Sequence, residues 1–199
     1  MNTAQLFFLI LLVSWNVVKS ACPDSTWKEF ARPDNNYNNT KLKVCLKYYD
    51  WDSRNPLEKD PLGTCYEQDS YLSSFGTDED FDWQVKTHNA RHKGYAFLTG
   101  AYRRKSCPNG IMNYPKSNPC HNRDYMVMWS DPFTKQDFFN KAPWMNPDEP
   151  NSLLGVVPEN CMQYTPRGFN DNICPNYKPH PGEAIWVNNQ GFFCMLESE

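Results

Sequence analysis

Residues 149–174 read EPNSLLGVVPENCMQYTPRGFNDNIC, and side chains that carry oxygen gather in three short clusters along this stretch. The clusters are Glu149-Pro150-Asn151, Glu159-Asn160-Cys161 and Phe169-Asn170-Asp171-Asn172-Ile173-Cys174. Three carboxylates and two amides within them are candidate ligands, namely Glu149, Asn151, Glu159, Asn170 and Asp171. Calcium takes about six to eight oxygen ligands in irregular geometry, so these side chains could form most of a calcium shell. Each cluster alone is more typical of an ordinary loop, and the prediction depends on all three occurring in order.

Two features of the same stretch would bring the clusters together. An X-Pro bond adopts the cis form at little cost, and a cis Pro150 would turn Glu149 and Asn151 to the same side. A disulfide between Cys161 and Cys174 would hold the second and third clusters close to each other. The stretch therefore predicts one site rather than three separate loops.

The beginning of the chain predicts secretion. Residues 6–18 are almost wholly apolar and are followed by small residues before Ala21, which is typical of a signal peptide over residues 1–20. The alternative is a membrane anchor, but the apolar run is shorter than the roughly 20 residues that a span requires. No second apolar span follows, so we expect an extracellular protein without a membrane anchor, whose residues 21–199 form a single domain.

Composition narrows the classes of partner. The formal net charge is −3 and no basic run occurs, so nucleic acid is not an expected partner. All eight cysteines follow residue 20, and an even number in an oxidising compartment predicts disulfides. Zinc is the alternative, but no Cys-x-x-Cys pair is present. The sequon Asn38-Asn39-Thr40 predicts a glycan on Asn38.

Hydrophobic patterning predicts short strands and one clear helix. The expected strands cover residues 26–30, 42–48, 95–98, 125–129, 161–164 and 192–196. A helix is expected over 77–88, with Thr77 as N-cap and acidic residues in its first turn. Cys22 and Cys45 would join the first two strands. The segments 102–123 and 132–158 show little periodicity, and long irregular segments in a compact domain are often functional.

These motifs together resemble the C-type lectin-like domain family. The family has Glu-Pro-Asn, then Glu-x-Cys, then Trp-Asn-Asp-x-x-Cys and a last strand ending in Phe-x-Cys, which matches Phe192-Phe193-Cys194 here. Trp129-Ser130-Asp131 resembles the family's Trp-Ser-Asp, and Trp144 resembles the tryptophan before its binding loop. Phe169 stands where the family usually has tryptophan. The resemblance extends over the whole expected mature chain and is closest from Trp129 onward.

The resemblance implies an α+β fold with two helices, two small antiparallel sheets and long loops. Disulfides would stabilise this fold. It implies the pairs Cys161–Cys174 and Cys65–Cys194, and Cys22–Cys45 and Cys107–Cys120 then follow by proximity. It also implies calcium as cofactor and glycans of the mannose, N-acetylglucosamine or fucose type as ligands. The same five residues would bind both, namely Glu149, Asn151, Glu159, Asn170 and Asp171. A role in innate immune recognition is the corresponding expectation.

Two other functions compete with a lectin. A module of this fold can bind protein instead of sugar, but crowded carboxylates are costly without a cation, which argues against that alternative. An enzyme would need a base, and the candidates are His88, His92, His121 and His180. No Gly-x-Ser-x-Gly nucleophile motif accompanies them, so no enzyme activity is expected. The sequence does not predict an oligomeric state.

Overall fold

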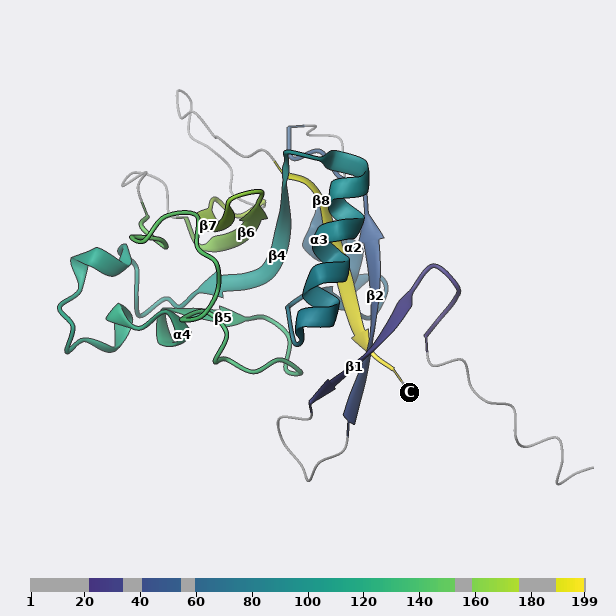
Figure 1. Cartoon of the computed structure of the whole chain (residues 1–199), viewed down its shortest axis with the longest axis horizontal. Coiled ribbons are helices and arrows are strands. Elements are labelled where there is room, and N and C mark those ends of the chain that lie inside the picture. Colours follow the sequence, from purple (N-terminus) through teal and green to yellow (C-terminus); the bar gives the residue numbers. More distant parts are fainter. Residues whose placement is uncertain (1–21, 34–40, 55–59, 153–158, 176–188, 199) are drawn as a thin grey trace, which may run out of the picture.

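The computed structural model describes residues 22–33, 41–54, 60–152, 159–175 and 189–198 (Figure 1). The predicted signal peptide, the sequon at Asn38 and His180 lie outside these residues. Within the described residues, no helix has the length and apolar character needed to cross a membrane.

The chain forms a mixed α+β fold, as predicted. The strands are β1 (Lys28–Pro33), β2 (Lys41–Tyr49), β3 (Tyr71–Leu72), β4 (Ala96–Arg103), β5 (Val127–Trp129), β6 (Cys161–Thr165), β7 (Gly168–Asn172) and β8 (Asn189–Glu197). The α-helices are α2 (Pro61–Tyr66), α3 (Asp78–His92) and α4 (Arg123–Met126), with 3₁₀ turns at Ile111–Asn113 and Pro119–His121. Strand β7 falls on the third oxygen-bearing cluster, where no strand was expected.

The strands form one connected sheet rather than two separate ones. Their order is β1-β2-β8-β4-β6-β7, with β3 on β8 and β5 on β4. Strand β4 makes this connection because it lies between β8 and β6. Its start pairs in parallel with β8, its pairing with β6 extends from Phe97 to Tyr102, and its end also pairs with β5. In Figure 1, β4 runs from the half that contains β1, β2, β8 and α3 to the half that contains β5, β6 and β7.

Helix α3 begins where the sequence predicts and continues four residues further, to His92 rather than residue 88. Thr77 and Asp80 form a reciprocal capping box at its start. At its end, Arg91 and His92 both bind Asp50, at 2.7 and 2.9 Å. The Arg91 cation in the last turn also complements the helix dipole, so the additional turn is stabilised by contacts with the chain after β2.

The buried face of α3 is polar, which explains the weak apolar pattern of its sequence. Its buried residues are Asp80, Gln84 and His88, at a spacing of four residues. Asp80 accepts a hydrogen bond from the buried Arg32 Nε at 2.7 Å, and Gln84 accepts one from Ser73 Oγ at 2.6 Å. The sheet therefore binds this helix through hydrogen bonds as well as through apolar contact.

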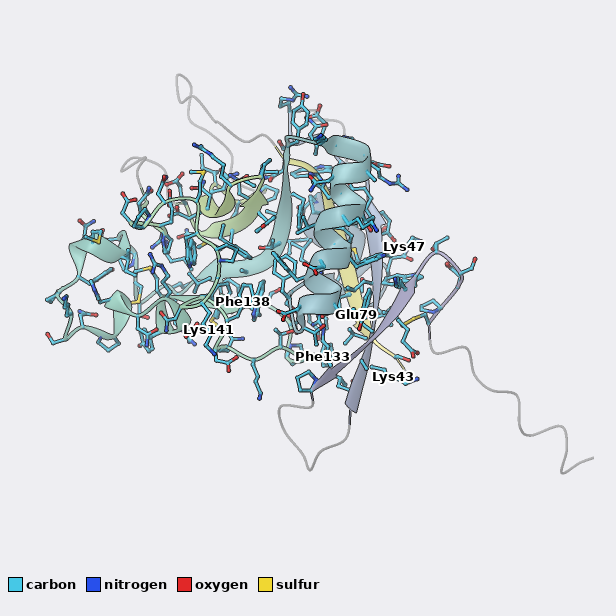
Figure 2. The ribbon with its side chains drawn as sticks, viewed as in Figure 1. Lys43, Lys47, Glu79, Phe133, Phe138 and Lys141 are labelled. Atoms are coloured by element: carbon cyan, nitrogen blue, oxygen red, sulfur yellow. A yellow bond between two sulfur atoms is a disulfide. The ribbon has the colours of Figure 1, made fainter. Side chains whose placement is uncertain are left out.

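An aromatic cluster fills the core between α3 and the long loops. Phe75 lies at its centre, within 4.9–6.3 Å, centroid to centroid, of the rings of Phe81, Phe97, Trp129, Phe138, Tyr164 and Phe169. Phe138, labelled in Figure 2, comes from the irregular segment 132–152 and also packs on Trp129 and Phe169. This segment lacks periodicity in sequence, yet its aromatic side chains anchor it to the core.

All four predicted disulfides are confirmed. They join Cys22 to Cys45, Cys65 to Cys194, Cys107 to Cys120 and Cys161 to Cys174. The first and last strands lie close together, because β2 pairs with β1 on one side and with β8 on the other. Figure 1 shows the carboxyl end beside β1 and β2.

Candidate functional site

The Glu149-Pro150-Asn151 turn has the predicted cis peptide bond before Pro150. The turn is held by its own side chains. The Glu149 carboxylate accepts hydrogen bonds from Asn151 Nδ2 at 2.9 Å, from Asn151 N at 3.2 Å and from Asn146 Nδ2 at 3.3 Å. The two outer residues of the motif therefore lie on the same side, as the sequence predicts.

Asp171 comes to this turn from β7. Its carboxylate accepts hydrogen bonds from Ser152 N at 2.8 Å and from Asn151 N at 3.3 Å. The β6–β7 pairing places Asp171 opposite Met162, and the Cys161–Cys174 disulfide joins the ends of the same hairpin. The first and third clusters thus form one group of side chains, which we call the acidic site: Glu149, Asn151 and Asp171.

The other two predicted ligands lie at the edge of this group. Asn170 is half-buried, and its Nδ2 donates to the carbonyl oxygen of Asp171 at 2.6 Å. Glu159 is buried, and its backbone carbonyl accepts a hydrogen bond from Arg103 Nε at 3.2 Å. The acidic site, as defined by the hydrogen bonds of the turn and of Asp171, contains three of the five predicted residues.

Arg103 is the residue of this site that sequence reasoning missed. It ends β4, its side chain is only 1% exposed, and its Nη2 forms an ion pair with Asp171 Oδ2. Its Nη1 donates to the carbonyl of Asn109 at 2.7 Å. In the sequence it stands next to Arg104 and Lys105, and nothing there distinguishes it from a surface residue.

The segment between Cys107 and Cys120, which the sequence could not assign, supports the turn. Ile111 N donates to the carbonyl of Pro150 at 2.9 Å. The chain passes so closely at Gly110 that an added Cβ would lie 2.0 Å from the carbonyl oxygen of Asn151. From α4, Arg123 Nε donates to the carbonyl of Glu149 at 2.7 Å. Backbone groups of the turn are therefore held from outside the motif.

Burial dominates the electrostatics of Glu149. The residue is 1% exposed, and this burial is the main cause that raises the pKa of Glu149 to about 8. The hydrogen bond with Asp171 and the negative charge of Asp171 raise it further. Two carboxyl groups this close do not both ionise readily. The half-buried Asn151 and Asn170 are the members of the predicted set that solvent reaches most easily.

The fit to calcium is incomplete. The donor types are those that calcium prefers. However, three N–H groups already point at the Asp171 carboxylate, from Arg103, Asn151 and Ser152. Within the described residues, no group of three or more His, Cys, Asp or Glu side chains is placed to hold a metal ion. The residues as arranged do not form the predicted shell, and calcium binding stays a prediction of the resemblance.

Comparison with solved structures identifies the fold. No protein-family model and no curated protein matches the chain. The SPL-1–GlcNAc complex matches with a TM-score of 0.50 and 15% identity, over 89% of this chain and 97% of that one. The chain has the C-type lectin-like fold.

Two further solved structures show the variety among proteins similar to this C-type lectin-like chain. The mouse scavenger receptor C-type lectin carbohydrate-recognition domain matches with 16% identity and a TM-score of 0.45, over 89% of this chain and 98% of that one. The Ca²⁺-independent C-type lectin SPL-2 from Saxidomus purpuratus matches with 14% identity and a TM-score of 0.44, over 87% and 92%. The SPL-1 structure is described as a complex with GlcNAc and not as an enzyme, in keeping with the expectation for this chain.

Proposed function

We propose that this lectin-like protein binds glycans of the mannose, N-acetylglucosamine or fucose type at the acidic site. The observation that carries the proposal is the convergence of Glu149, Asn151 and Asp171 from two distant segments, with the first two on one side of a cis-proline turn. Carboxylates accept hydrogen bonds and amides also donate them, so such a group can match the hydroxyls of a sugar. Secretion and a role in innate immune recognition complete the proposal.

Within this site the residues have different roles. Asn151 is half-buried and is the side chain best placed to contact a sugar hydroxyl. Glu149 is buried and binds both the backbone and the side chain of Asn151, so it orients that amide. Asp171 binds the same backbone from β7 and fixes the turn relative to the sheet.

Retention on immobilised sugars tests the proposal. We expect the full secreted chain to be retained on mannose, N-acetylglucosamine or fucose resin and eluted by the free sugar, with less retention on galactose. Asn151→Ala should abolish retention because it removes the reachable amide. Asn89→Ala is the matched control, since Asn89 is exposed on α3 and makes no contact with the acidic site. The paired exchange Glu149→Gln with Asn151→Asp should move preference towards galactose.

A protein-binding module is the second candidate, and Arg103 is the observation that favours it. Crowded carboxylates without a cation argue against a module that has lost sugar binding, but a guanidinium pairs with Asp171 here. If wild-type protein is retained on none of the four sugars, with or without calcium, the glycan proposal is wrong and this second candidate stands.

A further inference from the structure

The acidic site contains a positive charge that belongs to the chain itself. Arg103 lies at the end of β4, and its side chain is as buried as that of Asp171, each 1% exposed. Arginine stays protonated under all ordinary conditions, so its guanidinium brings a permanent positive charge into the site.

The guanidinium is held in place by the backbone around the site. Nε donates to the carbonyl of Glu159 at 3.2 Å, and Nη1 donates to the carbonyl of Asn109 at 2.7 Å. Nη1 also lies 3.2 Å from the Met126 sulfur. Only Nη2 binds a carboxylate, that of Asp171. Neutral acceptors thus orient the group, and Asp171 is the acid whose charge it balances.

The same contact opposes binding of a metal ion at Asp171. A buried carboxylate that is already paired with a guanidinium has lost most of its excess negative charge. A divalent cation at the Asp171 oxygens would also lie beside a fixed positive charge in a site that water does not screen, and like charges at close range repel strongly there. Three N–H groups already point at the same carboxylate.

We infer that Arg103 is the built-in cation of the acidic site, standing in for the calcium that the resemblance predicts. The arginine joins the Asp171 strand to β4 and to the backbone of Glu159. The site is therefore assembled without a metal ion, and ligand binding at this site is independent of calcium. The inference concerns the site of the proposed function but does not require sugar binding, because its first readout is the calcium response of protein stability.

Thermal unfolding of the full chain tests the inference. It is measured in three conditions: with calcium, with magnesium at equal ionic strength, and with chelator. We expect the same Tm for wild type in all three conditions and no heat of calcium binding by calorimetry at millimolar calcium. A saturable rise in Tm that is specific to calcium and abolished by Asp171→Asn would overturn the inference. This comparison requires no variant at Arg103, so it remains decisive even if such variants fail to fold.

Variants then separate charge from packing. Arg103→Met keeps the apolar volume but removes the charge, so its Tm should fall and should rise again with calcium. Arg103→Met combined with Asp171→Asn removes both charges and should unfold at a higher temperature than either single variant. Arg123→Met is the matched control, because the side-chain hydrogen bonds of Arg123 go to the carbonyls of Glu149 and Pro147 and not to a carboxylate. It should lower the Tm without creating a calcium response.

Two results from the variants would contradict the inference. One is a calcium response of Arg103→Met that is no larger than that of Arg123→Met. The other is additivity of the Arg103 and Asp171 changes, because residues that balance each other's charge show coupled effects. Sugar retention, measured separately with calcium and with chelator, distinguishes the two proposals. Retention that is lost only in chelator contradicts the inference. No retention in either condition contradicts only the glycan proposal.

Discussion

Gly110 is the residue at which the candidate site depends most directly on the absence of a side chain. Its backbone dihedral φ is −63°, an ordinary value, so the requirement does not come from backbone strain. It comes from proximity, because an added Cβ would lie 2.0 Å from the carbonyl oxygen and 2.6 Å from the carbonyl carbon of Asn151. The neighbouring atoms are backbone and cannot rotate away.

Gly110→Ala should therefore displace the Glu-Pro-Asn turn. We expect a loss of stability of about 1–3 kcal/mol, as for overpacking of a filled interior, and a clear loss of sugar retention. Gly63→Ala is the control, since the nearest atom to its added Cβ is 3.9 Å away and the position is helical. Chemical denaturation and resin retention measure the two effects. Equal behaviour of both variants would show that the segment from Cys107 to Cys120 does not position the turn.

A second buried ion pair, Arg32 with Asp80, lies far from the site in sequence but follows the same physics. The Arg32 guanidinium also donates to Ser74 and Thr134. Removing one partner leaves a buried charge unpaired, so Arg32→Met should cost about 3–5 kcal/mol. Lys43→Met, which breaks the exposed Lys43–Glu29 pair labelled at Lys43 in Figure 2, should cost about 1 kcal/mol or less. Urea denaturation of both variants checks the contrast.

At the scale of elements, α3 shows how a helix with little apolar character is held against a sheet. Thr77 and Asp80 cap its start, and Asp80, Gln84 and His88 form its buried stripe. The His88 ring lies between two partners, with Nε2 3.1 Å from the carbonyl of Tyr95 and Nδ1 3.2 Å from Tyr48 Oη. Nε2 can donate to the carbonyl of Tyr95, whereas the Tyr48 hydroxyl also lies 3.1 Å from the carbonyl of Gln190 and can donate its one proton to only one of its two neighbours.

The state of His88 predicts how stability depends on pH. Burial is the main cause that lowers the pKa of His88, and the nearby His92 lowers it as well. The hydrogen bond to Tyr95 and the charge of Asp50 raise this pKa and oppose the effect only in part. The unfolded chain has an ordinary pKa of about 6.5 and binds the proton first as pH falls. The contribution of His88 to stability should therefore decrease as pH falls below about 6.5, while Glu149, whose pKa is raised to about 8, acts in the opposite direction. His88→Gln should remove the His88 contribution, so the pH dependence of its Tm should differ from that of the wild type. Tm measured across this range checks it, and an unchanged slope in the variant would contradict it.

At the scale of the whole molecule, the disulfides divide between those that close the fold and those that hold the site. Cys65–Cys194 joins residues 129 positions apart and links α2 to β8. Cys161–Cys174 spans 13 positions and joins the ends of the β6–β7 hairpin, which carries Asp171. Long closures remove more entropy from the unfolded chain than short ones.

Removal of these two disulfides should give different results. Replacing Cys65 and Cys194 by Ala should cost about 5 kcal/mol, against about 3 kcal/mol for Cys161 and Cys174, on the chain-entropy model. The shorter disulfide should nevertheless cost more in sugar binding, because it constrains the hairpin of the acidic site. Guanidinium denaturation and resin retention of the two double variants check this. A larger loss of binding from the Cys65–Cys194 variant, at a temperature where both are folded, would contradict it.

The short motifs of this chain determine much of the fold without reference to tertiary structure. Alternating strands, the Thr77 cap and the order of Glu-Pro-Asn, Glu-x-Cys and Asn-Asp-x-x-Cys predict the fold class, and the resemblance that they carry predicts the four disulfides. The cis bond before Pro150 also follows from its local motif. The strands, the cap and the cis bond are predictable because each depends on residues that are close in sequence, whereas the disulfide pairs follow from the family resemblance.

Charge balance inside the site was decided only by tertiary structure. Arg103 lies 68 positions before Asp171 and looks like an ordinary surface arginine in the sequence, yet at the end of β4 its side chain binds the Asp171 carboxylate. Gly110 and Arg123 likewise meet the Glu-Pro-Asn turn through space. A sequence shows which groups carry charge, but the cost of a charge depends on its burial and on its nearest partner, and both are properties of the folded chain.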